Sequence, residues 1–219
     1  MALEDLWPLF ALRLTTPRLV LRVVRDEDLD ALVDAALAGV HDPGTMPFGV
    51  PWTDQPPDVL RREFVRFQWS LRTRTRPDDW TLPLVVLEDG RPVGVQDVAG
   101  RDFTARRTIE SGSWLTRSAQ GRGLGTEMRA AILLLAFDAL GAEWAESSAA
   151  AWNARSLGVS RRLGYRLNGV SRVHPDGHDA VEEQRVRLHR DDLVRPGWTL
   201  RVEGLERVRP ELLGGTVSS

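Results

Sequence analysis

The glycine-rich stretch Gln120-Gly121-Arg122-Gly123-Leu124-Gly125 constrains this chain more than any other segment. It lies between a strand-like segment, residues 108–115, and an apolar run with helical spacing, residues 126–140, which Gly141 ends. A strand, a glycine turn and a helix in this order direct successive backbone N–H groups into one concavity at the positive end of a helix dipole. The stretch therefore predicts a site for a phosphate or pyrophosphate.

The spacing of the glycines excludes two common phosphate-binding motifs. The dinucleotide fingerprint G-x-G-x-x-G would need a glycine at Thr126 or at Met128. The P-loop G-x-x-x-x-G-K-[ST] requires a lysine, and the chain contains none. What remains is Q-x-x-G-x-G, and six residues alone are also compatible with a glycine turn that binds nothing.

Composition limits the remaining classes of function. A chain of 219 residues with 42% apolar residues predicts one domain with a full core. The net charge of −2 gives no bulk attraction to nucleic acid or to an anionic membrane. The absence of cysteine excludes disulfides, Cys–zinc sites and a thiol nucleophile, and the four histidines are too scattered to predict a metal site.

Neither a run of about 18 apolar residues nor a secretory signal is present in the sequence. We therefore expect a cytoplasmic protein without a membrane partner.

The spacing of apolar residues predicts an α+β fold with a mixed sheet. The expected order is β-α-α-β-β-β-α-β-α-β-β. The strands are expected at residues 14–24, 82–87, 92–98, 108–115, 144–150, 165–170 and 182–188, and the helices at 26–38, 58–73, 126–140 and 153–163. We expect a single domain over residues 12–192, an N-terminal lead-in at 1–11, and a C-terminal tail at 193–219, where no clear period is visible.

Four ordered stretches make the chain resemble a GNAT acyltransferase across roughly residues 12–192, and it is most similar to the branch of ribosomal-protein N-terminal acetyltransferases. Residues 15–22, T-T-P-R-L-V-L-R, resemble the opening T-x-R-L-x-L-R of that branch. Residues 110–115, E-S-G-S-W-L, are similar to its fourth strand, E-I-G-Y-W-L. The glycine stretch resembles motif A, (Gln/Arg)-x-x-Gly-x-(Gly/Ala), and residues 153–165 resemble N-x-x-S-x-x-V-x-x-x-x-G-F, with Tyr165 in place of phenylalanine.

The resemblance implies acetyl-CoA as co-substrate, no metal, and a central, mostly antiparallel twisted sheet flanked by helices. The pyrophosphate would bind the N–H groups from Gly121 to Thr126, and Arg122 would either add a charge-assisted contact or stay solvated. In GNAT proteins the fourth strand splays from its neighbour and frees backbone N–H groups for the acyl carbonyl and pantetheine. The donor site implied in this way consists of Trp114, Leu115, Thr116, Gln120, Gly121, Arg122, Gly123, Leu124, Gly125, Thr126, Asn153 and Ser156.

Two residues are candidates for proton transfer. Glu110 shares one face of its strand with Gly112 and Trp114, and a carboxylate at this place, acting through water, resembles the base of several GNAT members. An ion-pair role is the alternative for Glu110, and Glu182 and Glu183 are weaker candidates for the base. The resemblance implies that Ser156 lies near the CoA sulfur and protonates it. The tyrosine acid of many GNAT enzymes has no counterpart in residues 159–161, and Tyr165 is expected in the core.

The acceptor pocket is expected at the loop that holds Met46, Phe48 and Trp52 and at the second helix, residues 58–73, although these aromatic side chains could equally fill the core. The sequence therefore predicts an N-acetyltransferase that moves an acetyl group from acetyl-CoA to a primary amine by direct attack in a ternary complex. The amine could belong to a protein N-terminus or to a small molecule. A non-catalytic acyl-CoA-binding protein of the same fold is the alternative, and the chain is expected to be a monomer or a homodimer that binds no nucleic acid.

Overall fold

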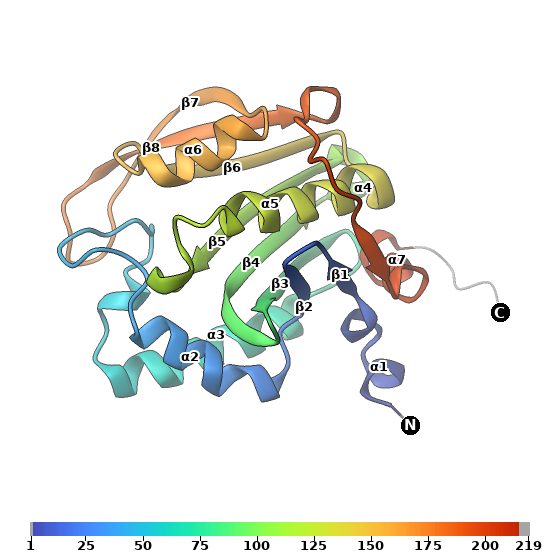
Figure 1. Ribbon diagram of the computed structural model, residues 1–219, viewed down its shortest axis with the longest axis horizontal. Helices are drawn as coiled ribbons and strands as arrows, with labels where there is room; N and C mark the ends of the chain where they lie inside the picture. Colours follow the sequence, from blue (N-terminus) through green and yellow to red (C-terminus); the bar gives the residue numbers. More distant parts are fainter. Residues whose placement is uncertain (1, 215–219) are drawn as a thin grey trace.

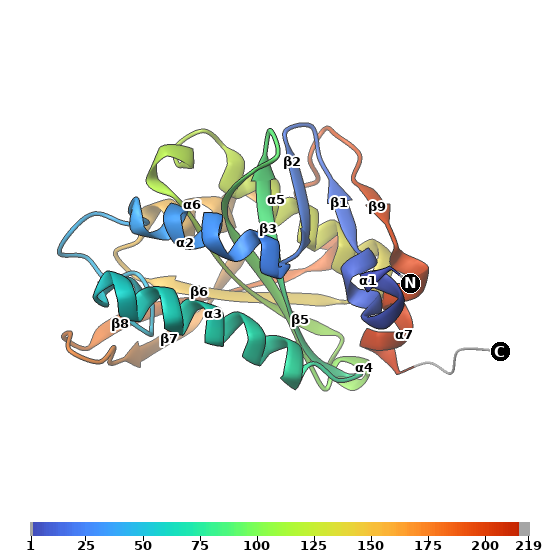
Figure 2. The same ribbon diagram turned by 90° about the horizontal axis from the view of Figure 1, so that it is seen from below.

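The computed structural model describes residues 2–214, which form a nine-stranded sheet flanked by helices (Figures 1 and 2). The strand order is β7-β8-β6-β5-β4-β3-β2-β1-β9. Every pair of neighbours is antiparallel except β5 and β6, which are parallel. The α+β class and the mostly antiparallel sheet expected from the sequence are confirmed.

The elements follow the predicted pattern with additions at both ends. The strands are β1 (Arg13–Thr15), β2 (Leu19–Val23), β3 (Asp79–Glu88), β4 (Arg91–Arg101), β5 (Thr108–Leu115), β6 (Trp144–Ala150), β7 (Arg166–Val173), β8 (Val181–His189) and β9 (Arg201–Glu203). The α-helices are α1 (Leu3–Leu6), α2 (Leu29–Leu37), α3 (Pro57–Arg74), α4 (Phe103–Arg106), α5 (Leu124–Leu134), α6 (Ala154–Arg162) and α7 (Leu205–Leu213). No helix among these residues is both long and apolar enough to cross a membrane.

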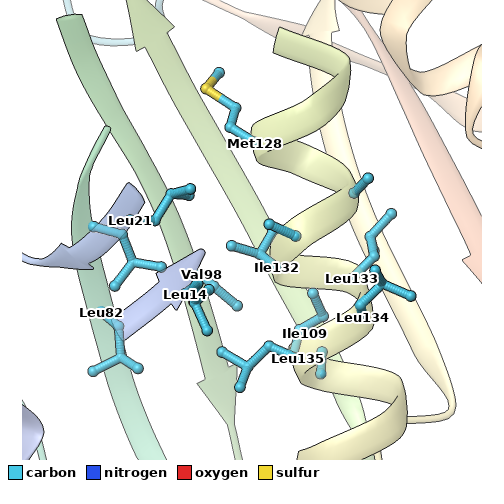
Figure 3. Close-up of a cluster of buried hydrophobic side chains, with 14 of the residues drawn as sticks. Leu14, Leu21, Leu82, Val98, Ile109, Met128, Ile132, Leu133, Leu134 and Leu135 are labelled. Atoms are coloured by element: carbon cyan, nitrogen blue, oxygen red, sulfur yellow. The ribbon is translucent and has the colours of Figure 1, made fainter. Parts of the chain in front are cut away.

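The sheet carries a hydrophobic core on each face. On one face, α5 packs on the central strands through residues such as Ile132 and Leu135, which point toward Val98 and Leu82 (Figure 3). On the other face, α2 and α3 cover β3 and β4, with Phe64 of α3 in the core that includes Val85 and Val95. Alternation along β3 and β4 assigns successive side chains to the two cores, as the period of a strand requires.

Strands β5 and β6 separate after a short parallel pairing. Their register contains three residue pairs, Thr108–Trp144, Ile109–Ala145 and Glu110–Glu146. Beyond these pairs β5 continues beside β4 as far as Leu115, while β6 continues beside β8 as far as Ala150. The segment 111–115 therefore has a partner strand on one side only.

Three local expectations from the sequence are wrong. The predicted first strand, residues 14–24, is two strands, because Thr16 N–H donates to Leu19 O (2.9 Å) and closes a hairpin at Pro17, which has no N–H. Residues 103–106, expected to be a plain connection, form the helical turn α4. The long helix begins at Leu124 rather than at Thr126, and its last turn, Leu135–Leu140, is a π-helix.

The segment expected to be a C-terminal tail contributes β9 and α7 to the fold. Strand β9 pairs with β1, and α7 packs on the N-terminal turn η1 (Pro8–Ala11). Val208 and Leu212 of α7 are fully buried, and Leu212 O accepts a hydrogen bond from Trp80 Nε1 (3.1 Å). Among the described residues, the two ends of the chain therefore stabilise the same edge of the sheet (Figure 1).

Candidate active site

The glycine loop presents a row of backbone donors at the start of α5. Gly121 and Gly123 have φ angles of 74° and 84°, a left-handed conformation that favours glycine. Within residues 2–214, the N–H groups of the five residues from Gly121 to Gly125 donate to no protein acceptor. The Thr126 N–H, which we expected to join them, donates to Gly123 O (3.1 Å). Five free donors at a helix N-terminus fit a phosphate group.

Glycine is required at this loop for a second reason. A Cβ added at Gly121 would meet nothing within 4 Å, so the space beside its backbone is open. A Cβ at Gly125 would lie 3.7 Å from Val159 Cγ2 of α6, so the loop also lies against that helix. A ligand can therefore approach the backbone at Gly121 closely, as the binding of a pyrophosphate requires.

The guanidinium of Arg122 points away from the space beside the free N–H groups and binds Glu88 instead. Its Nη1 and Nη2 bind Glu88 Oε2 and Oε1 at 2.8 and 2.6 Å, and its backbone O accepts from Arg18 Nη1 (2.9 Å). The charge-assisted phosphate contact considered for Arg122 is therefore absent in this structure, and the residue instead fixes the loop to the β1–β2 hairpin and to the end of β3.

Two other arginines, which the sequence reasoning missed, flank the loop. Arg117 and Arg155 line a cavity of ≈ 240 Å³ together with Asp42, Gln120 and Gly121. Arg117 Nη2 contacts Asp42 Oδ1 (2.9 Å), while Arg155 Nη1 reaches Gln120 Oε1 (3.4 Å). The signal in the sequence was an arginine three residues before the motif and another just after the α6 cap.

Gln120 uses its side chain to hold the end of β5. Its Nε2 donates to Val40 O (2.6 Å) and to Leu115 O (2.8 Å). It thereby joins the segment after α2 to the last residue of β5. Gln120, the first residue of the motif, therefore connects two backbone segments. It lies beside the free N–H groups of the loop and is not one of them.

Of the three backbone donors expected at the end of β5, one faces the open side. Thr116 N–H donates to Val93 O on the β4 side (2.8 Å). Because N–H directions alternate along a strand, the Trp114 N–H also faces β4, and only the Leu115 N–H faces the side that β6 has left. The expectation of three free donors was therefore wrong for Thr116, and the alternation removes Trp114 as well.

The start of α6 brings Asn153 and Ser156 beside the loop helix. Asn153 caps α6, with its Oδ1 accepting from Ser156 N (3.1 Å), as the sequence predicted. The Ser156 hydroxyl is half-buried and forms no hydrogen bond to any described residue. It is therefore available to a ligand.

A buried arginine lies between α5, α6 and β5. Arg129 Nη1 donates to Ser160 Oγ (3.2 Å) and Nη2 to Ser113 Oγ (3.3 Å), and burial lowers the pKa of its guanidinium. Tyr165 is buried in the same region, as expected, and burial raises the pKa of its phenol. The sequence analysis did not identify Arg129, because its partners Ser113 and Ser160 lie on other elements and no local pattern joins them.

The opposite face of the sheet carries two carboxylates at β4 and β5. Glu110 and Gly112 are exposed there, and Asp97 of β4 lies directly opposite Gly112. Burial raises the pKa of the Asp97 carboxyl to about 7. Asp97 was not identified from the sequence, because a single acid in a strand gives no pattern.

An aromatic cluster forms the wall beside these carboxylates. The Trp52 ring lies 5.4 Å from Phe48, 6.1 Å from Phe64 and 5.6 Å from Trp114, measured between centroids. Phe48, Trp52 and Trp114 are half-buried and Phe64 is buried. The loop of residues 42–57 thus contacts the end of β5 through Trp52 and Trp114, whereas Met46 is buried in the protein.

A family model supplies the observation that decides the identity of this fold. The model described as an acetyltransferase (GNAT) domain matches residues 18–166, which is more than half of the chain. The chain belongs to the GNAT acetyltransferase family. It is therefore an acetyl-CoA-dependent N-acetyltransferase by family, in agreement with the resemblance seen in the sequence.

Solved structures with the same fold include named members of this family. RimJ of Mycobacterium smegmatis in complex with CoA-disulfide is 23% identical, with a TM-score of 0.70 and coverage of 92% of this chain and 94% of that one. RimL, a ribosomal L7/L12 alpha-N-protein acetyltransferase, is 18% identical (TM-score 0.62, 81% and 97% covered). The microcin C7 self-immunity acetyltransferase MccE is 14% identical (TM-score 0.62, 80% and 93% covered). At these identities the likeness concerns the fold.

The GNAT fold brings most of the expected residues to one place. The glycine loop, the end of β5 and the start of α6 meet around the opening between β5 and β6, while Glu110 lies on the other face of β5. The Leu124 side chain is fully buried, so this residue can offer a ligand only its N–H. No group of three or more histidine, aspartate or glutamate side chains suited to a metal occurs in the described part of the chain.

Proposed function

We propose that this chain transfers the acetyl group of acetyl-CoA to a primary amine, on a protein N-terminus or a small molecule, by direct attack in a ternary complex. The observation that carries the proposal is the row of five free N–H groups from Gly121 to Gly125 beside the unpaired edge of β5. Donors for a phosphate group and an unpaired strand edge for the acyl chain thus lie next to each other.

The donor site in this proposal runs from the loop to the strand edge. The pyrophosphate accepts from the loop N–H groups, and Arg117 and Arg155 supply positive charge at the adjoining cavity. The pantetheine arm follows residues 111–115, where β5 lacks a second partner strand. Ser156 and Asn153 line the same route from α6.

The residues at the end of this route match the needs of acyl transfer. The Leu115 N–H is available for the oxyanion that forms when the amine attacks the thioester, and one such donor contributes roughly 3 kcal/mol to barrier lowering. The Ser156 hydroxyl has no hydrogen-bond partner among residues 2–214 and can give its proton to the leaving thiolate. Glu110, exposed on the other face of β5, can accept a proton through water.

The acceptor is expected to enter from the face of β5 that carries Glu110 and the aromatic cluster. Half-buried aromatic rings beside carboxylates suit an amine attached to an apolar group. The names of RimJ and RimL favour a protein N-terminus, and that of MccE, solved with acetyl-CoA and AMP, favours a small molecule. The activity assay therefore includes both protein N-termini and small-molecule amines as acceptors.

The test measures transfer directly. The protein is incubated with acetyl-CoA and with three sets of acceptors: peptides with a free α-amine, N-blocked peptides that contain lysine, and small primary amines. Released thiol and product mass are then measured. Acetylation of one set, with thiol released in proportion, supports the proposal. Binding of acetyl-CoA without any acetylated product would instead support the non-catalytic acyl-CoA-binding protein.

A further inference from the structure

Asp97 occupies a central position on the acceptor face of the sheet. It lies on β4 between Pro83 of β3 and Gly112 of β5, on the face that carries Val95 and Trp114. Residues directly opposite in an antiparallel pair have Cα atoms about 4.5–5.5 Å apart, and diagonal neighbours are about 7–8 Å apart. Glu110 and Trp114 are those diagonal neighbours, so Asp97 lies between the expected base and the aromatic wall.

One oxygen of the Asp97 carboxyl is buried without a hydrogen-bond partner in the described part of the chain. This oxygen, Oδ1, is inaccessible to solvent. The residue as a whole is half-buried, and the position opposite it is a glycine beside which a Cβ would meet nothing within 4 Å. The Asp97 carboxyl therefore has one oxygen, Oδ1, buried in the protein, while the side chain as a whole borders the open space over Gly112.

The residues that pack around Asp97 are apolar or neutral, with Glu110 as the exception. On β3, Asp97 faces Pro83, and on β5 the single titratable neighbour on this face is Glu110. The side chains that α2 and α3 bury against this face carry no charge: Leu29, Leu32, Val33, Ala36, Leu60, Phe64, Gln68 and Leu71. Desolvation is accordingly the cause of the raised pKa of Asp97, which lies at about 7.

We propose that Asp97 is a catalytic residue that takes the proton from the ammonium of an α-amine acceptor. The proposal rests on the proposed function and deepens it, since it names both a base and a class of acceptor. Asp97 adjoins the open space over Gly112, and Gly112 belongs to the strand whose other edge receives the donor, so an amine bound over Gly112 would lie beside both Asp97 and the donor edge.

The protons and electrons balance in this step. The acceptor ammonium gives one proton to the Asp97 carboxylate, and the neutral amine nitrogen forms a bond to the acetyl carbon while the carbonyl π pair moves to oxygen. The carbon–sulfur bond then breaks as the carbonyl reforms, the nitrogen loses its second proton, and the thiolate gains one. Asp97 releases its proton to solvent, so the net products are the amide, CoA thiol and one proton.

The acceptor class follows from matching the base to the acid. An α-ammonium has a pKa of about 8, whereas a lysine ammonium has one of about 10.4. A carboxylate with a pKa of about 7 deprotonates the first with a penalty of about tenfold and the second with a penalty of more than a thousandfold. Proton transfer to Asp97 is therefore nearly balanced for an α-amine and strongly uphill for a lysine side chain, so an α-amine is the better-matched acceptor.

The first experiment is a pH–rate profile of kcat/KM with a free α-amine peptide. Wild type, Asp97→Asn, Asp97→Glu, Glu110→Gln and the surface control Asp34→Asn are compared. We expect kcat/KM of wild type to rise tenfold per pH unit below about 7, the Asn variant to lose at least 100-fold with that rise removed, and the Glu variant to regain part of it. A profile unchanged in Asp97→Asn, or abolished only in Glu110→Gln, would overturn the proposal.

A second measurement does not depend on turnover. If the folded protein keeps Asp97 protonated up to about pH 7, charging it there opposes folding, so Asp97→Asn should melt at a higher temperature than wild type at pH 8. The difference should shrink as the pH falls from about 7 to about 4 and vanish only below that, because the Asp97 carboxyl of the unfolded chain stays ionised down to its ordinary pKa of about 3.9. Equal melting temperatures at pH 8 would contradict the assigned environment.

Failure of this inference and failure of the proposed function give different results. A wild-type protein that acetylates no amine would overturn the proposed function and the role of Asp97 with it. An active wild type whose Asp97→Asn variant keeps full activity, or which acetylates the N-blocked lysine peptide as fast as the free α-amine peptide, would overturn this inference alone.

Discussion

Arg18 and Glu127 are separated by 109 residues in the sequence and joined by a paired contact in the fold: Arg18 Nε donates to Glu127 Oε2 (2.7 Å) and the Arg18 N–H to Oε1 (3.0 Å). Thr16 Oγ1 donates to the same Oε1 (2.6 Å). Since Arg18 Nη1 also holds Arg122 O, this pair connects the first hairpin to the glycine loop and to the first turn of α5.

Replacing Glu127 with alanine should therefore affect both stability and donor binding. The Arg18 N–H and guanidinium would lose their acceptor and the buried Thr16 hydroxyl would keep only Leu19 O, so we expect a loss of about 2–3 kcal/mol in the free energy of unfolding. Urea unfolding with and without acetyl-CoA measures both effects. Glu63→Ala on the outer surface of α3 is the control, and a Glu127 variant as stable as this control would show that the pair does not support the loop.

Gln120→Ala should release the end of β5. Two carbonyl groups, Val40 O and Leu115 O, would lose the amide that satisfies them, which is expected to cost about 1–3 kcal/mol. Because Leu115 also carries the N–H that faces the open edge, turnover should fall as well. The exposed Gln55→Ala is the matched control in thermal unfolding. A variant with normal stability and normal kcat would contradict the proposed connection.

Ser156 and Asn153 should separate turnover from stability. Ser156→Ala keeps the backbone N–H that Asn153 caps, so we expect an unchanged melting temperature and a kcat lowered by about tenfold or more. Asn153→Ala loses the cap and should cost about 1 kcal/mol of stability. The serine-to-alanine control is Ser70 within α3. If Ser156→Ala turns over at the wild-type rate, the thiolate receives its proton from another group.

Local signals in the sequence were enough for the elements that enclose the donor site. The predicted bounds of β5 and β6 agree with the structure, and the Asn153 cap and the α6 helix followed from an N-cap residue and a closing glycine. Alternation on both sides of Pro17 predicts one strand over residues 14–24, and only the pairing register reveals the hairpin between β1 and β2.

Features that depend on long-range packing were beyond the sequence. Helix α7 is held by burial of Val208 and Leu212, and Gly204 before it lies so close to Ala11 O that a Cβ would meet it at 2.1 Å. The Arg122–Glu88 pair and the position of Asp97 opposite Gly112 likewise depend on which strands are neighbours. The order of the strands in the sheet therefore determines which side chains meet at the site, and the local spacing of apolar residues does not reveal that order.

Acetyl-CoA titration of two glycine variants tests the central claim, that the glycine loop binds the donor, most directly. Gly121 and Gly177 have nearly equal φ angles of 74° and 76°, and neither has an atom within 4 Å of an added Cβ, so alanine should strain both backbones alike. Only the Cβ at Gly121 would enter the space beside the free N–H groups. We predict wild-type affinity for Gly177→Ala and at least tenfold weaker binding for Gly121→Ala, measured by calorimetry. Equal affinities in the two variants would contradict the account.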